Sequence, residues 1–124
     1  PPSVTKPRDK PPKEPQGAPE RKDILGRGED WWREKAMEWK QKLTKSQKDY
    51  EAAFAALKAK EKELDDAKFK PKSLQRKLQD EVKVLEEKAN VQKKQVDEAK
   101  NMLEKVLPKQ AEEYRADPSW LRTD

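Results

Sequence analysis

A turn between two helices is encoded in residues 57–85, LKAKEKELDDAKFKPKSLQRKLQDEVKVL. Leucines stand at positions 57 and 64 before Pro71 and at positions 78 and 85 after it, so the same seven-residue spacing occurs on both sides. Proline disfavours helical geometry at the residue before it, which ends a helix at this point. A short connection here would bring the leucines of the two helices opposite one another.

Helix-forming sequence extends far on both sides of this turn. Residues 30–69 contain no glycine or proline and are dominated by Ala, Lys, Glu and Leu. The same holds for residues 73–107, up to Pro108. We therefore expect two helices over these ranges, which form an antiparallel hairpin because their lengths match and their connection is short.

Apolar residues repeat in heptads along both predicted helices. In the first helix, position a holds Ala36, Leu43, Tyr50, Leu57 and Leu64, and position d holds Trp32, Trp39, Ser46, Ala53, Lys60 and Ala67. In the second, position a holds Gln75, Val82, Ala89, Val96 and Leu103, and position d holds Leu78, Leu85, Gln92, Ala99 and Val106. Spacing of this kind is typical of a coiled coil. Folding about Pro71 places Ala53 opposite Ala89 and Lys60 opposite Val82, where we expect the lysine to extend its ammonium into water.

The composition excludes a large globular core. Of 124 residues, 44% are charged and only 31% are hydrophobic. No run approaches the roughly 18 apolar residues that a membrane span needs. The chain has no cysteine and no histidine, which removes the thiolate nucleophile, the commonest metal ligand and the commonest general base. We therefore expect no enzyme, no cofactor and no small-molecule substrate.

Residues 1–29 are predicted to be a disordered, proline-rich linker. They contain seven of the ten prolines and all three glycines, separated by charged residues. Proline prevents regular backbone hydrogen bonding, and too few apolar groups are present to offset the entropy of ordering. The PxxP spacing of Pro12 and Pro15 also fits a ligand of an SH3-like domain, although the composition favours a semi-rigid spacer. A linker implies a folded domain upstream of Pro1.

Aromatic residues gather at the open end of the hairpin. Trp31, Trp32 and Trp39 begin the first helix, and Trp120 lies in residues 108–124, where we expect a short helix and a tail that folds back. Aromatic side chains bury large areas, so these residues are predicted to pack on one another. The alternative is an exposed patch for a protein partner, because Trp is enriched at interface hot spots.

Three apolar residues outside the seam suggest a second surface. Val84 and Val91 lie at position c of the second helix, and Phe54 lies at position e of the first. A seam between two helices buries little surface, so a homodimer or another protein partner would cover these residues and add stability. The alternative is that they are scattered surface residues.

Basic residues surround the turn, namely Lys68, Lys70, Lys72, Arg76 and Lys77. The formal net charge of +5 arises from 30 basic and 25 acidic residues that are spread along the chain. A nucleic-acid surface requires bases clustered on one face without acids between them, so this partner is disfavoured for the chain as a whole. The tip alone is a candidate contact for phosphate or an anionic surface, and the alternative is a solvated loop.

Three short motifs occur in a distinctive order. They are EDWWR at residues 29–33, FKPK at residues 69–72 and PSWLR at residues 118–122. This order, over residues 1–122, resembles the C-terminal portion of bacterial envelope proteins that begin with the domain of unknown function 4124. The resemblance implies a signal peptide and a small β-rich domain upstream, neither of which is visible in this chain. It also implies an exported, periplasmic or envelope-associated protein of unknown biochemical role, and it assigns no catalytic residue.

We therefore predict an all-α protein with an antiparallel two-helix coiled-coil hairpin. A disordered proline-rich segment precedes the hairpin, and a short helix and tail follow it. The predicted function is a non-catalytic structural or protein-interaction module. The alternative is a basic coiled-coil adaptor that binds nucleic acid or an anionic surface through its lysine-rich tip.

Overall fold

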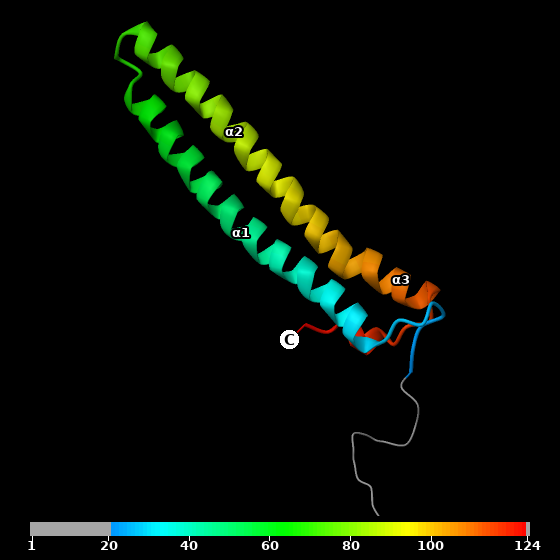
Figure 1. Ribbon diagram of the computed structural model, residues 1–124. Helices are drawn as coiled ribbons and strands as arrows, with labels where there is room; N and C mark the ends of the chain where they lie inside the picture. Colours follow the sequence, from blue (N-terminus) through cyan, green and yellow to red (C-terminus); the bar gives the residue numbers. More distant parts are fainter. Residues whose placement is uncertain (1–20, 124) are drawn as a thin grey trace, which may run out of the picture.

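Two long helices packed in opposite directions make up most of the molecule (Figure 1). The computed structural model describes residues 21–123. The elements are α1 (Glu29–Asp66), α2 (Lys72–Asn101), the π-helical segment η1 (Met102–Val106), α3 (Leu107–Glu113) and the 3-10 helix η2 (Pro118–Leu121). The predicted all-α antiparallel hairpin is confirmed.

The seam between α1 and α2 follows the predicted heptads. Every predicted a and d position, from Trp32 to Val106, is buried or half-buried. The middle of the seam is a cluster of buried residues formed by Ala53, Leu57, Val82 and Ala89, with Tyr50, Leu64 and Leu85 packed against it. The cluster draws on both helices and brings Ala53 together with Ala89, as folding about Pro71 predicts.

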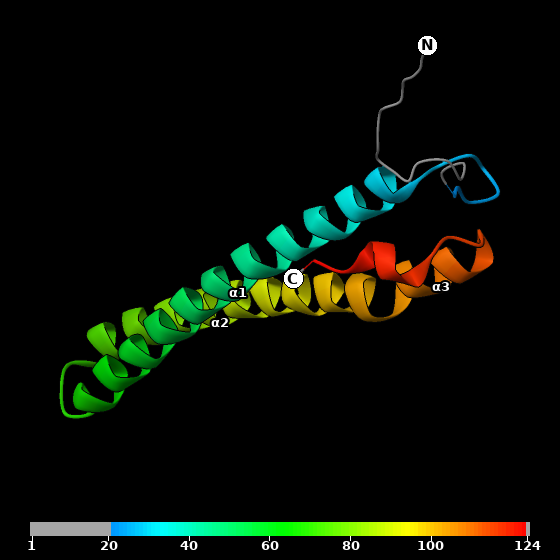
Figure 2. The same cartoon turned by 90° about the horizontal axis from the view of Figure 1, so that it is seen from below.

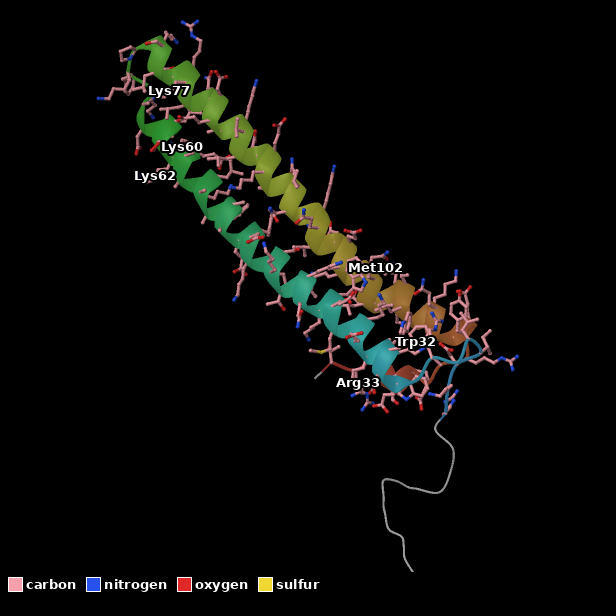
Figure 3. The ribbon with its side chains drawn as sticks, in the orientation of Figure 1. Trp32, Arg33, Lys60, Lys62, Lys77 and Met102 are labelled. Carbon is pink, nitrogen blue, oxygen red and sulfur yellow. The ribbon has the colours of Figure 1, made fainter. Side chains whose placement is uncertain are left out.

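Lys60 shows how the seam tolerates a charged residue. Its side chain is 26% exposed, and its Nζ lies 2.8 Å from Oε1 of Glu63 and 3.4 Å from Oε1 of Glu81 on α2 (Figure 3). The apolar stem covers the seam while the ammonium remains paired at its edge. The hydrogen bond that Lys60 donates to Glu63 raises its pKa, burial opposes this effect, and Glu81 adds to it. The contact between Lys60 and Glu81 therefore links the two helices at the edge of the apolar seam.

The turn at the far end begins earlier than predicted. α1 ends at Asp66 rather than at residue 69, because the backbone N–H of Ala67 donates to two carbonyls of the last helical turn and the chain then curves. Lys70 donates its N–H to the carbonyl of Ala67 at 2.9 Å, which closes the turn before Pro71. Proline disfavours helical geometry only at the residue before it, which is Lys70. The helix ends earlier than this, because the chain must reverse its direction before α2 begins.

Helical structure continues past Leu107, where the sequence predicted an end. η1 is inserted just before Pro108, and α3 follows without a break. Proline lacks an N–H and its ring clashes with the carbonyl four residues earlier, and a π-helical turn relaxes the hydrogen-bond ladder at such a point. The wider turn also rotates the buried face, so that Leu107 and Ala111 point inward instead of the next heptad positions.

A left-handed residue reverses the chain after α3. Arg115 has a φ of 60°, its N–H donates to the carbonyl of Glu112, and the N–H of Ala116 donates to the carbonyl of Ala111 at 2.8 Å. These two bonds form a Schellman motif, in which glycine is the usual left-handed residue. The reversal returns η2 to the start of α1, so the tail lies beside α1 and α3 (Figure 2). The predicted fold-back of the tail is therefore confirmed.

Residues 21–28 pack on the helix ends, although the sequence assigned them to the linker. Asp23 is buried, and the N–H of Ile24 donates to the carbonyl of Tyr114 at 2.9 Å. The packed unit therefore extends at least from Asp23, because the loop forms specific polar contacts that its glycine-rich composition does not reveal. The rest of the predicted linker, residues 1–20, lies outside the described residues.

Cysteines introduced at Ala53 and Ala89 are expected to form a disulfide within one chain. Both residues are buried in the same cluster, and the chain has no cysteine of its own. Mass spectrometry after mild oxidation at low protein concentration detects the crosslink. Cysteines at the exposed neighbours Ala52 and Asn90 are the matched control and should stay reduced. Crosslinks formed only between chains would contradict the hairpin.

Arg115→Gly is expected to raise the free energy of unfolding by about 1 kcal/mol, because glycine adopts a positive φ without a steric cost. The contact with Arg21 survives, since Nη2 of Arg21 donates to the backbone oxygen of residue 115. Urea denaturation followed by circular dichroism measures the change. Arg122→Gly, at a residue with a φ of −68°, is the control and should give no gain. An unchanged value for Arg115→Gly would show that this backbone is not strained.

Candidate functional sites at the two ends of the hairpin

The hairpin has two chemically different ends. We call the base the end formed by residues 21–28, the start of α1 and residues 111–121, and we call the tip residues 68–77 (Figure 1). α1 contains 38 residues, so the two ends lie about 57 Å apart along the helix.

Asp23 is the centre of the base. Its side chain is 0% exposed. The carboxylate accepts hydrogen bonds of 2.8 Å from the N–H of Leu25, the N–H and Nε of Arg27, and Nε1 of Trp32. Burial alone raises the pKa of Asp23, but the hydrogen bonds from Arg27, Trp32 and Leu25 outweigh it and lower the pKa to about 2. The carboxylate therefore remains charged at neutral pH and ties the loop to α1.

Arg27 lies among three aromatic rings. Its guanidinium carbon is 4.1 Å from the ring centroid of Trp31, 5.0 Å from that of Trp32 and 4.8 Å from that of Tyr114. A cation over an aromatic face is attracted by the ring quadrupole, and more strongly where water is excluded. One side chain therefore joins the loop, α1 and the end of α3, and its charge is matched internally by Asp23.

Of the four tryptophans predicted to pack on one another, Trp31, Trp32 and Trp120 share one cluster, and Trp39 lies outside it. Trp32 and Trp120 are 1% and 6% exposed and belong to one cluster (Figure 3). Trp31 is half-buried and packs edge-on against Trp32 at a centroid distance of 5.0 Å. Trp39 is half-buried, and Nζ of Lys42 lies 4.2 Å from the centroid of its ring. Trp32 and Trp120 are consequently closed to a partner, whereas Trp31 and Trp39 retain partly exposed rings.

Phe54, Val84 and Val91 do not form one surface. They are 42%, 63% and 52% exposed, respectively. Phe54 borders a hollow that Tyr50 also lines, whereas Val84 borders a different hollow beside Lys60. Heptad positions e and c lie on opposite sides of the seam, which explains the separation. Only Val84 and Val91 remain together, as a short stripe along α2.

The five basic residues of the tip have no ion-pair partner within the part of the chain that the structure describes. They are Lys68, Lys70, Lys72, Arg76 and Lys77, and all are exposed. Figure 3 labels Lys77 at this end of the hairpin. Some lysines farther along α1 are paired on their own helix, as Lys62 is with Asp66 at 3.3 Å. Residues 67–79 contain no acid, so no carboxylate of the turn itself balances this charge. The structure therefore concentrates the predicted anion contacts at one end.

Phe69 is the residue of the tip that the sequence reasoning missed. Its side chain is 93% exposed. Nε2 of Gln75 donates to the carbonyls on either side of it, at 3.1 Å to Lys68 and 2.8 Å to Lys70. These two bonds, which we call the Gln75 clamp, tie the backbone on both sides of Phe69, and Nζ of Lys68 lies 5.7 Å from the centroid of the Phe69 ring. The indication in the sequence was an aromatic residue between lysines at a turn, KFKPK.

Comparison with known proteins gives no family model, no curated protein and no solved structure that matches the chain. Across residues 21–123, no helix combines the length and the apolar character needed to cross a membrane. The functional argument therefore rests on the geometry of the two ends.

Asp23→Asn is expected to lower the thermal unfolding midpoint at pH 7 by roughly 5–10 °C, because a buried charge that accepts several hydrogen bonds is lost. The pKa of Asp23 is about 2 in the folded protein, below the value of about 3.9 for an unfolded aspartate. Its stabilisation is therefore complete above about pH 4 and is lost as the pH falls from about 4 to 2. The difference in unfolding midpoint between wild type and variant, measured by circular dichroism, should therefore become smaller as the pH is lowered through this range.

Two controls accompany this measurement. Asp97→Asn removes an exposed carboxylate that pairs with Lys93 on the same helix, and should leave the midpoint nearly unchanged. Removal of residues 1–20 keeps every contact of the base described above, whereas removal of residues 1–25 also removes Asp23. Only the longer truncation should lower the midpoint. Equal midpoints for the two truncations, or a gap that does not vary with pH, would contradict the role of Asp23.

Proposed function

We propose that this chain is a non-catalytic interaction module in which the base stabilises the hairpin and the tip contacts a partner. The observation that carries the proposal is Phe69, which is 93% exposed in a turn whose backbone the hydrogen bonds of Gln75 tie on both sides. Aromatic residues are enriched among the few side chains that supply most of the binding energy at interaction sites. The aromatic residues of the base, in contrast, serve the packing of the chain itself.

The distribution of charge supports the same division. Arg27 is paired with Asp23 and surrounded by rings. The cations of the tip are left to solvent and are available to an external anion. The uninterrupted helices between the two ends act as a spacer of about 57 Å, because α1 runs through 38 residues.

An exported, envelope-associated location belongs to this proposal. Its support is the order of the EDWWR, FKPK and PSWLR motifs, which resembles bacterial envelope proteins that begin with the domain of unknown function 4124. Fractionation of cells that produce the natural full-length protein tests the location. Recovery in the cytoplasmic fraction alone would contradict it.

Self-association through α2 is a second candidate. Val84 and Val91 are 63% and 52% exposed on one side of α2. Pairing of two hairpins along this stripe would bury both residues in a four-helix arrangement. Photocrosslinking at single positions tests both candidates, because contacts of the tip and of α2 are detected separately.

A photoreactive amino acid placed at Phe69 is expected to form adducts in cells that produce the protein, because this position faces the partner. The same amino acid at Gln47, an exposed position on α1, is the matched control and should form none. A third variant carries it at Val84, where an adduct between two copies would support self-association. Electrophoresis and mass spectrometry identify the products. A Phe69 variant without any adduct would refute the proposed role of the tip.

A further inference from the structure

We infer that the tip docks on the surface of an anionic lipid bilayer, with Phe69 inserted among the lipids and the basic residues around it in contact with headgroups. This inference rests on the proposed function and identifies the partner of the tip. It is carried by the coincidence of one exposed aromatic ring with five cations that have no ion-pair partner among residues 21–123, at one end of the hairpin.

The shape of the tip favours a bilayer. Phe69 projects from the apex of a narrow turn, and Leu74, 39% exposed, extends the apolar surface onto the first turn of α2. A convex apolar apex provides no concave site that would enclose a small ligand. A bilayer interface accommodates an apolar side chain at the depth where headgroups meet acyl chains. The ring is already exposed and the Gln75 clamp ties the backbone around it, so little rearrangement is needed before insertion.

The charge of the tip fits an anionic lipid surface. All five cations lie within residues 68–77, and residues 67–79 contain no acid. Each basic residue near an anionic bilayer strengthens binding by about fivefold. Insertion of one apolar side chain or attraction by a few charges is weak alone, and stable attachment combines the two. The tip supplies both components within one turn.

Nucleic acid is less well matched to the same charges. A protein that binds a duplex contacts phosphates along a stripe of basic residues. The acid-free run stops at Asp66 and Asp80, and beyond it acids are interspersed with the basic residues, as where Lys62 pairs with Asp66 and Lys60 pairs with Glu63 and Glu81. The cationic surface is therefore compact and centred on an apolar residue, which suits a lipid interface.

Sedimentation with lipid vesicles tests the inference on the full chain. The vesicles are phosphatidylcholine alone or phosphatidylcholine with about 30% phosphatidylglycerol, which provides the anionic surface. We expect binding to the anionic vesicles only, with loss of binding at high salt. Phe69→Ser should weaken binding by about tenfold, and Lys70→Glu/Lys72→Glu should weaken it by at least about tenfold.

Matched variants separate the tip from general effects of charge and hydrophobicity. Lys88→Glu/Lys94→Glu changes the net charge equally on the exposed side of α2, and Val91→Ser removes an exposed apolar residue elsewhere. Both should bind within about twofold of wild type, because neither alters the tip. All substituted residues are exposed, so circular dichroism should show the same helicity in every variant.

A fluorescent probe locates the contact. Because the chain has no cysteine, Ser73→Cys and Gln47→Cys each accept one polarity-sensitive label, at the tip and in the middle of α1, respectively. We expect a blue shift on anionic vesicles for the Ser73 label alone.

Three results would overturn the inference. The first is that the protein does not bind anionic vesicles. The second is that Lys88→Glu/Lys94→Glu weakens vesicle binding as much as the tip variants do. The third is that the protein binds a short DNA duplex more tightly than vesicles and that Phe69→Ser has no effect on DNA binding. A protein adduct at Phe69 in cells, combined with no vesicle binding, would refute the lipid partner and leave the proposed function intact. Absence of any adduct at Phe69, of protein or lipid, would refute the proposed function itself.

Discussion

The hydrogen bond from the Trp32 indole to the Asp23 carboxylate, 2.8 Å long, is the contact on which the base depends. Two helices bury only one stripe each, and the open end of a hairpin would expose that stripe to water. Asp23 closes this end because its carboxylate also holds Arg27, whose guanidinium covers Trp31 and Tyr114. A single buried charge thus joins the N-terminal loop, the start of α1 and the end of α3. The coiled-coil seam then needs to supply only the contacts between the helices.

The seam could be predicted from the sequence, because the heptad spacing and the position of Pro71 together specify which residues meet. The segment Met102–Val106 could not be predicted in the same way. A π-helical turn changes which face is buried without changing the helix-forming character of the residues. Pro108 marks the place, but a proline is compatible with an end, a kink or a wider turn. Packing against Trp32 selects the continuous helix, because only the rotated phase directs Ala111 into the aromatic cluster.

The candidate sites, like the helices, could be predicted from the sequence only in part. The basic residues of the tip follow from their density in the sequence, but Phe69 next to an apolar seam is equally compatible with a core position. The place of Phe69 outside the seam goes with Gln75, whose polar side chain stands at heptad position a and binds the carbonyls on either side of Phe69. Asp23 lies in sequence that has the composition of a linker. Gly26, with a φ of 84°, suggests flexibility there, yet it forms the tight turn that wraps backbone N–H groups around the Asp23 carboxylate.

Cations lie beside aromatic rings at both ends, with different consequences for folding. At the base, the guanidinium of Arg27 is enclosed by rings and bonded to a buried carboxylate, so the pairing contributes to the folded state. At the tip, Lys68 lies 5.7 Å from the centroid of a ring that is itself 93% exposed, and such a solvated pair contributes little. The turn is closed by backbone bonds and by Gln75, neither of which needs an aromatic side chain at position 69. The stability of the hairpin therefore does not account for Phe69, which is the reason for proposing a contact outside the chain.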